Sequence, residues 1–245
     1  MSLLKVAGIE KRFGAIEALR GVSFHADAGE VVALVGDNGA GKSTLMKVIT
    51  GIYRPEAGAV EFDDDDITNI APGSIRERGI EMIYQDLALA RQQDVAANIF
   101  LGREPVKKLF GCLPVIDRET IDRDAARMIE RLGARIPDIK NEVGFLSGGQ
   151  QQSVAIARAL TFDPKLVIMD EPTAALAVRE VEHVLDLIRE LKRQGIAVVL
   201  ISHRLTDVFA VSDRIVALRQ GQVIADERTD QTSMNEVVSH IVGAH

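Results

Sequence analysis

The chain has little of several residue types that mark particular kinds of protein. Its 245 residues include one cysteine, Cys112, and no tryptophan, and aromatic residues make up 4%. One cysteine cannot close an internal disulfide or build a cysteine metal site, which fits a reducing compartment. Few aromatic rings are available to stack on nucleic-acid bases. The net charge of −7 opposes binding to phosphate backbones, so no nucleic-acid partner is expected.

Long apolar runs are also missing. The longest, such as residues 196–201, have the length of a strand, whereas a membrane-spanning helix needs about 20 residues. The first ten residues lack the apolar region and the cleavage site of a secretory signal, so the chain is expected to stay where it is made. With 47% apolar and 27% charged residues, the chain has the composition of a globular protein of one domain or two small ones.

Strand and helix patterns alternate along much of the sequence. Strands are predicted over residues 3–10, 18–24, 31–35, 166–169 and 196–201. Helices are predicted over residues 42–50, 119–132 and 178–194. Residues 86–160 are mostly helical in pattern and are interpreted as a subdomain, with an irregular connection over 102–118 because of its prolines and glycines. The acidic quartet 63–66 is expected to be a loop tip. The alternation predicts an α/β fold with a largely parallel sheet.

A glycine-rich segment between the predicted strand 31–35 and the helix 42–50 matches the phosphate-binding loop pattern, Gly-x-x-x-x-Gly-Lys-Ser. Glycines allow backbone amides to surround a phosphate, the lysine contacts β and γ oxygens, and the serine hydroxyl binds Mg²⁺. The segment therefore predicts a nucleoside triphosphate as ligand, with Mg²⁺. The candidate binding residues are Gly36, Asp37, Asn38, Gly39, Ala40, Gly41, Lys42, Ser43 and Thr44.

Two carboxylates, Asp170 and Glu171, end the apolar strand 166–169, and Pro172 follows them. In a parallel sheet, the end of this strand reaches the same crevice as the phosphate-binding loop. Asp170 is therefore a candidate Mg²⁺ ligand, and Glu171 a candidate base that orients and deprotonates water.

The pentapeptide 146–150, Leu-Ser-Gly-Gly-Gln, opens a predicted alanine-rich helix. Ser147 is a good N-cap, and the two glycines leave bare amides at the helix start that could meet a second phosphate group. By itself the segment is equally consistent with a capped helix.

Taken in order, the loop 36–43, Gln85, the pentapeptide 146–150, the strand with its acidic pair, and His203 resemble the nucleotide-binding subunit of ATP-binding cassette (ABC) transporters. The likeness runs from residue 3 to residue 243. It implies a single cassette over residues 1–245 with a RecA-like P-loop NTPase core, mainly parallel, over residues 1–85 and 161–245. It also implies an antiparallel β subdomain and a helical subdomain over 86–160.

The resemblance also implies functions for residues that carry no signal alone. Phe13 stands where the family stacks an aromatic ring on adenine, Gln85 where it senses Mg²⁺ and contacts the membrane partner, and His203 where it touches the γ-phosphate. The family pairs two cassettes head to tail, so the signature of one copy covers the phosphates held by the other. The implied signature residues are Ser147, Gly148, Gly149 and Gln150.

Two positions depart from the family pattern. Ala177 stands where an aspartate is common, in the segment through which the paired sites communicate. Gln151 stands where arginine is commoner, which removes one positive charge near the start of the signature helix.

Further segments, such as 83–89, 98–104 and 201–209, resemble bacterial importers of monosaccharides of the ribose, xylose and fructose type. The resemblance implies an ATPase bound peripherally to the cytoplasmic face of the cell membrane. Its implied partners are a second copy, two integral-membrane permease subunits and, indirectly, a sugar-binding protein. An importer of amino acids or peptides is an alternative, and so is a soluble ABC ATPase acting on DNA or ribosomes. The latter usually has a second cassette, a coiled-coil insertion or a basic surface, none of which is visible here.

Overall fold

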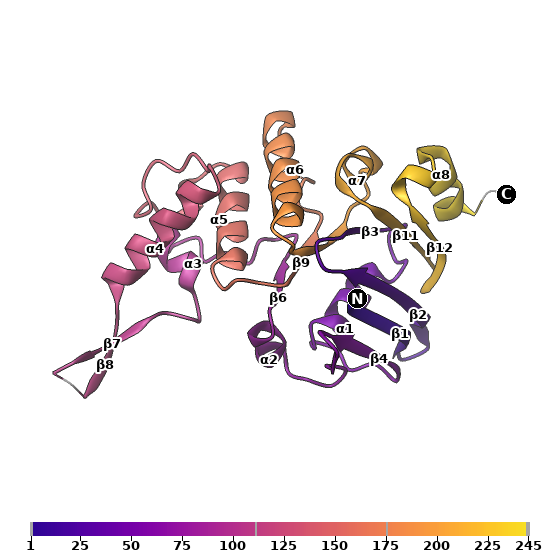
Figure 1. Cartoon of the computed structure of the whole chain (residues 1–245), viewed down its shortest axis with the longest axis horizontal. Helices are drawn as coiled ribbons and strands as arrows, with labels where there is room; N and C mark the ends of the chain where they lie inside the picture. Colours follow the sequence, from indigo (N-terminus) through magenta and orange to yellow (C-terminus); the bar gives the residue numbers. More distant parts are fainter. Residues whose placement is uncertain (1, 111, 175, 244–245) are drawn as a thin grey trace.

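A mostly parallel sheet of six strands lies at the centre of the computed structural model, which describes residues 2–110, 112–174 and 176–243 (Figure 1). In spatial order its strands are β12 (Gln222–Arg228), β11 (Arg214–Arg219), β3 (Val31–Val35), β10 (Ala197–Ile201), β9 (Leu166–Asp170) and β6 (Ile80–Ile83). Only β12 is antiparallel to its neighbour. Parallel sheets are covered on both faces, so their strands are continuous apolar runs. This explains why every residue of β3 and β10 is buried.

A second sheet is antiparallel. It contains β2 (Ile16–Asp27), β1 (Ser2–Phe13), β4 (Ala57–Phe62) and β5 (Asp65–Asp66), in that order. β1 and β2 extend beyond the predicted strands because they pair along most of their length, and Gly14, with φ of 60°, allows the tight turn between them. Asp63 and Asp64 adopt left-handed backbone conformations between β4 and β5, so the predicted acidic tip is a turn followed by a short strand.

The helices fall into two groups along the chain. The first and last parts of the chain form α1 (Lys42–Ile49), α2 (Pro72–Glu77), α6 (Val178–Arg193), α7 (Leu205–Val211), α8 (Met234–Val242) and the 3₁₀ turn Thr229–Gln231. The middle forms α3 (Val95–Phe100), α4 (Arg118–Arg131), the 3₁₀ turn Val143–Phe145 and α5 (Gly148–Leu160). In the part of the chain that the structure describes, no helix has both the length and the apolarity needed to cross a bilayer.

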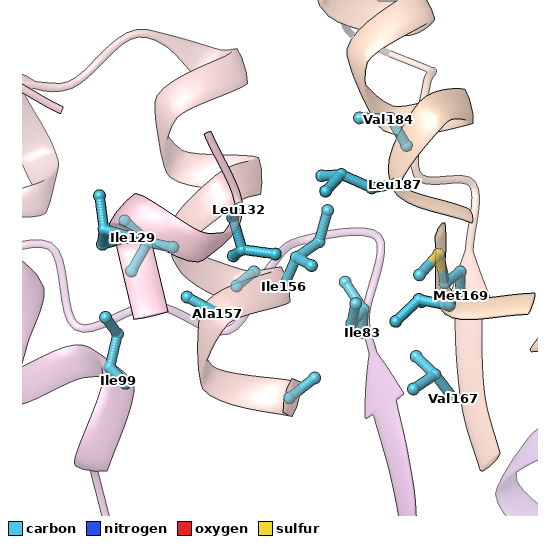
Figure 2. Close-up of a cluster of buried hydrophobic side chains, with 14 of the residues drawn as sticks. Ile83, Ile99, Ile129, Leu132, Ile156, Ala157, Val167, Met169, Val184 and Leu187 are labelled. Carbon is cyan, nitrogen blue, oxygen red and sulfur yellow. The ribbon is translucent and has the colours of Figure 1, made fainter. Parts of the chain in front are cut away.

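The apolar core contains two large clusters on opposite sides of the central sheet and a smaller one that includes residues of α7 and α8. Figure 2 shows strand residues of one cluster facing residues of α5 and α6: Ile83, Val167 and Met169 face Ile156 and Leu187. The alternate residues of β9, Leu166 and Ile168, point into the other large cluster, which contains residues of α1 and of the antiparallel sheet. This alternation follows from the two-residue period of a strand. β9 therefore belongs to both clusters and carries Asp170 and Glu171 at its end.

The prediction of an irregular connection over residues 102–118 is wrong. β7 (Val106–Leu109) and β8 (Leu113–Ile116) form an antiparallel hairpin that projects away from the helices (Figure 1). The prolines in this segment indicated a break in regular structure. Pro114 nevertheless lies in β8, because a two-stranded hairpin has open edges where a missing amide hydrogen removes no ladder bond.

Candidate active site

A cleft of about 830 Å³ opens where the central parallel strands β3, β9 and β10 end. It brings together the phosphate-binding loop, the acidic pair, Gln85 and His203, which are far apart in the sequence. Ligands of such sheets usually bind at the carboxyl ends of the parallel strands. The lining residues are Ile16, Glu17, Ala18, Arg20, Gly36, Asp37, Asn38, Gly39, Ala40, Gly41, Lys42, Ser43, Thr44, Gln85, Asp170, Glu171, Ile201, His203 and Gln220.

Two glycines of the loop are required by packing as well as by backbone conformation. A Cβ atom on Gly36, where φ is +148°, would lie 2.2 Å from the carbonyl oxygen of Leu218. A Cβ atom on Gly41, where φ is +107°, would lie 2.7 Å from the carbonyl oxygen of Ala18. The loop thus packs directly on the backbone of β11 and β2, and α1 begins immediately after it at Lys42. This places free amides and a helix N-terminus at the cleft, an arrangement that attracts anions.

Lys42 is held across the loop. Its Nζ donates hydrogen bonds to the carbonyl oxygen of Gly36 at 2.6 Å and to that of Asp37 at 3.0 Å. Burial lowers the pKa of Lys42, whereas the nearby carboxylates, Glu171 foremost and then Asp170, oppose this shift. A partly desolvated ammonium group in a phosphate loop interacts more strongly with an anion than an ammonium group in water does.

The acidic pair lies directly beyond β9. Burial, followed by the charge of Glu171, raises the pKa of Asp170, and Lys42 opposes this effect. Glu171 has a left-handed backbone, with φ of 51°, and its amide donates to the carbonyl oxygen of Ile201 at 2.9 Å. Such a conformation is unfavourable for a residue other than glycine and is found at sites where the neighbouring structure enforces it.

One carboxylate oxygen of Glu171, Oε2, is buried and accepts no hydrogen bond from any residue that the structure describes. Nδ1 of His203 lies 2.8 Å away, but the contact lacks hydrogen-bond geometry. The side chain of Glu171 is 12% exposed, whereas that of His203 is 65% exposed. Buried oxygens normally accept a hydrogen bond, so Oε2 lacks its usual partner at a point beside His203.

Phe13 and the signature residues do not line this cleft. Phe13 is 42% exposed at the end of β1, where its ring meets that of Tyr53 edge to face at 5.2 Å. Its partner across the hairpin, Ile16, does line the cleft. Ser147 caps α5 as predicted: its Oγ accepts from the amide of Gln150 at 3.3 Å, and its own amide donates to Oε1 of Gln150 at 2.9 Å.

The remaining signature residues lie in the first turn of α5. A Cβ atom on Gly148 would lie 3.8 Å from the side chain of Leu176, just before α6, and one on Gly149 would lie 2.4 Å from a carboxylate oxygen of Glu180 in the first turn of α6. The hydroxyl of Ser147 also lies 3.5 Å from a carboxylate oxygen of Glu180. The signature is therefore packed against the segment that contains the departure at position 177.

Sequence reasoning missed one rim of the cleft. Its members lie on β2 and in the turn between β11 and β12: Ile16, Glu17, Ala18, Arg20 and Gln220. The amide of Arg20 donates to the carbonyl oxygen of Gly221 at 2.8 Å, which joins these two segments. No local motif marks them, because the rim arises from pairing between distant parts of the chain.

A glycine-rich loop between a parallel strand and a helix, its lysine, and two acids at the end of a neighbouring strand define a P-loop nucleoside-triphosphatase site. The fold predicted from the sequence, a mainly parallel core with a separate antiparallel sheet, is confirmed.

Comparisons with known proteins place the chain more narrowly. The family profile described as ABC transporter matches residues 19–174. The xylose/arabinose import ATP-binding protein XylG of Sulfolobus acidocaldarius is 43% identical over 96% of this chain and 92% of that protein. The ribose import ATP-binding protein RbsA of Geobacillus kaustophilus is 43% identical over 98% of this chain, which spans 48% of RbsA.

Solved structures agree with this placement. A nucleotide-free ATP-binding cassette from an ABC transporter superposes with a TM-score of 0.84 and 32% identity, covering 99% of this chain and 96% of that one. A dimeric bacterial ABC transporter cassette gives a TM-score of 0.80 and 26% identity, with 92% and 98% covered. The chain belongs to the ABC transporter family, and it is an ATP-binding ATPase. The resemblance inferred from the sequence motifs is confirmed.

Proposed function

We propose that this ATPase drives import of a monosaccharide through a separate permease. The observation that carries the proposal is the cleft, in which the phosphate-binding loop, Asp170, Glu171 and His203 converge. The sugar is suggested by relatives that are named for xylose/arabinose and ribose import and match 96–98% of this chain. For a relative such as RbsA, about twice as long, only the matched half supports the proposal.

ATP would bind with its phosphates on the loop 36–44 and its β and γ oxygens near Lys42. Mg²⁺ would be held by Ser43, Gln85 and Asp170, which line the same cleft and offer the oxygen ligands that this ion prefers. The raised pKa of Asp170 supports this assignment, since burial and the neighbouring Glu171 disfavour its charged form and a bound cation would favour that form. Bound Mg²⁺ would neutralise charge on the β- and γ-phosphates.

Glu171 is the proposed base. Its side chain lines the same cleft as Lys42 and Ser43, so its carboxylate can orient an attacking water there and then take its proton. His203, exposed beside it, would contact the γ-phosphate and steady the Glu171 side chain through the 2.8 Å contact. Phe13 would stack on adenine at the β1 end, next to the rim formed by Ile16.

The signature residues 147–150 are proposed to act on the ATP site of a second copy. They contribute nothing to the cleft of their own chain, and a dimeric cassette is among the similar structures. Two copies would therefore close head to tail around two ATP molecules. In this proposal residues 86–160 act as a helical subdomain that carries the signature, while 1–85 and 161–245 hold the nucleotide.

A groove next to Gln85 is the proposed docking place for the permease. It has a volume of about 250 Å³ and is lined by α2, β6, the end of α5 and Leu101. The chain would lie peripherally on the cytoplasmic face of the membrane, beneath two permease subunits that receive sugar from a binding protein. Closure of the dimer on ATP would move the groove, and the permease segment within it, as one body.

The test replaces Glu171 by glutamine, which keeps the shape of the side chain and removes the base. Hydrolysis is expected to fall by about 10²- to 10⁴-fold, the usual contribution of general-base catalysis. The E171Q chain should form an ATP-dependent dimer in size-exclusion chromatography. E182Q, on the exposed face of α6, is the control and should behave as wild type. Glu171 is not the base if E171Q hydrolyses ATP normally, or if it fails to dimerise while the wild type is active.

The transport assignment is tested separately, by purifying the protein from native membranes with its partners. Recovery of a permease and a sugar-binding protein supports monosaccharide import. Recovery of an amino-acid or peptide-binding protein would instead change the substrate class. ATPase activity that is stimulated by polynucleotide at physiological salt would identify a non-transport ATPase.

A further inference from the structure

The β7–β8 hairpin exposes apolar side chains along both strands and at its tip. Phe110, between the two strands, is 91% exposed, and Val106 is 67% exposed. The other exposed apolar side chains of the hairpin are Leu109, Leu113 and Ile116. An isolated two-stranded hairpin is marginally stable in water, and contiguous exposed apolar residues usually mark a binding surface. Figure 1 shows the hairpin projecting from the body of the molecule.

The base of this hairpin, by contrast, is well anchored. The amide of Asp117 donates to the carbonyl oxygen of Pro105 at 2.8 Å, and Arg118 pairs with Asp94 at 2.7 Å. Just before the hairpin, Arg103 pairs with the buried Glu81 at 2.9 Å and lies 4.3 Å from the ring of Phe162. The hairpin is therefore joined to the helical part of the chain at its base, while its apolar side chains are exposed along both strands.

Both faces of the hairpin combine apolar side chains with one lysine. Residues directly opposite each other across an antiparallel pair share a face. The register thus puts Val106, Lys108, Pro114 and Ile116 on one face and Lys107, Leu109, Leu113 and Val115 on the other. A flat protein surface or groove covers mainly one face of such an element. A hairpin that is apolar on both faces is better suited to insertion into lipid, which surrounds it on all sides.

The charge of this segment also favours contact with lipid. Residues 103–118 contain four basic and two acidic residues, in a chain whose net charge is −7; Lys107 pairs with Asp117 at 3.1 Å and remains half-exposed. This local positive charge is suited to the anionic headgroups of a bilayer, and the apolar tip to the boundary between headgroups and acyl chains. The hairpin and α2, which lines the proposed permease groove, both lie below the central sheet as drawn in Figure 1.

We propose that the β7–β8 hairpin is a lipid anchor, which inserts the apolar side chains around Phe110 into the interface of an anionic bilayer while Lys107 and Lys108 bind headgroups. It gives the ATPase a contact with the membrane besides the permease. The side of the membrane that the hairpin would face follows from the proposed function, on which the inference rests to that extent. Lipid binding itself requires neither ATP nor permease.

The experiment is flotation of the purified full chain with vesicles of phosphatidylethanolamine and phosphatidylglycerol, compared with vesicles of phosphatidylcholine alone. Wild type should float with the anionic vesicles. Two lysines at about 1 kcal/mol each predict a loss of affinity of at least about tenfold for K107S/K108S and for wild type on neutral vesicles. F110S/L113S should lose at least as much, because two apolar side chains no longer leave water.

Matched controls separate the hairpin from general surface effects. V238S/V242S removes exposed apolar side chains from α8, and K5S/K165S removes two exposed lysines elsewhere. Both controls should float as wild type does. All variants should retain wild-type ATPase rates, because none of these residues lines the cleft. Retained ATPase activity therefore separates failure of the lipid inference from failure of the ATPase assignment.

The inference is overturned if wild type does not float with anionic vesicles, or if the hairpin variants float as well as wild type. It is also overturned if F110S/L113S changes only recovery of the permease, which would make the hairpin a protein contact. A change in oligomeric state without lipid, together with unchanged flotation, would assign the hairpin to contact with a second copy of the chain.

Discussion

Replacing Asn98 should be among the most damaging changes to the helical part of the chain. Its side chain is fully buried in α3 and makes four hydrogen bonds to the segment before the helix. Oδ1 accepts from the amide of Ala90 at 2.8 Å. Nδ2 donates to the carbonyl oxygens of Ala90, Gln93 and Asp94 at 3.0, 3.2 and 3.0 Å. One side chain thus holds the segment that leads from Gln85 to the helices.

The size of the effect follows from what each group loses in N98A. The three carbonyl oxygens each keep another donor, namely the amides of Gln93, Val143 and Asn98 itself. Only the amide of Ala90 loses its partner among the described residues, and this amide is half-buried. An unpaired amide costs about 1–3 kcal/mol, and the lost bonds to carbonyls add to this. The free energy of unfolding should fall by about 2–3 kcal/mol, which corresponds to a drop in Tm of roughly 5–10 °C.

Urea unfolding followed by circular dichroism measures this loss, since the chain has no tryptophan to report by fluorescence. N141A is the control. Asn141 is exposed and its side chain makes no hydrogen bond to the described residues, so its replacement should change the free energy by less than about 0.5 kcal/mol. If N98A destabilises the protein no more than N141A does, the hydrogen bonds assigned to Asn98 do not hold this segment.

Three further changes have defined outcomes. G36A should weaken ATP binding at least about tenfold in calorimetric titration, because its Cβ would lie 2.2 Å from the carbonyl oxygen of Leu218. G14A, at φ of +60° with open space around the added Cβ, should not. D170N should abolish ATPase activity yet raise Tm at pH 7. Burial and a neighbouring carboxylate raise the pKa of Asp170 above its ordinary 3.8, so wild-type stability falls as the pH rises through the raised pKa, and the variant should lose this slope. R214M should cost about 2–4 kcal/mol in urea unfolding, because it leaves two partly buried carboxylates without their shared cation.

The parts of the site that could be predicted are those encoded by neighbouring residues. A buried strand, a glycine-rich loop and a helix follow one another at 31–49, and the acids come directly after β9, so both could be placed at the ends of parallel strands. The end of α6 could also be predicted from neighbouring residues, because Gly195, with φ of +80°, follows the last turn of the helix.

The parts that could not be predicted depend on contacts between distant segments. Ile16 and Gln220 meet at the cleft because β2 pairs with β1 while the turn after β11 packs against β2, and no local pattern records either contact. The pairing of β7 with β8 was hidden for a different reason. Its prolines and turn residues predict a break, and they are compatible with a strand only because both edges of this hairpin are open.

The position of Glu171 connects the chemistry of the cleft with the two apolar clusters. β9 contributes alternate side chains to both clusters, and it is hydrogen-bonded to β6 on one side and to β10 on the other. Glu171 follows this strand in a left-handed conformation and is bonded through its amide to the last residue of β10. A close-packed strand resists small displacements, so it holds a strained residue in place. Packing of both clusters on β9 therefore fixes the position of the carboxylate oxygen that lies 2.8 Å from His203.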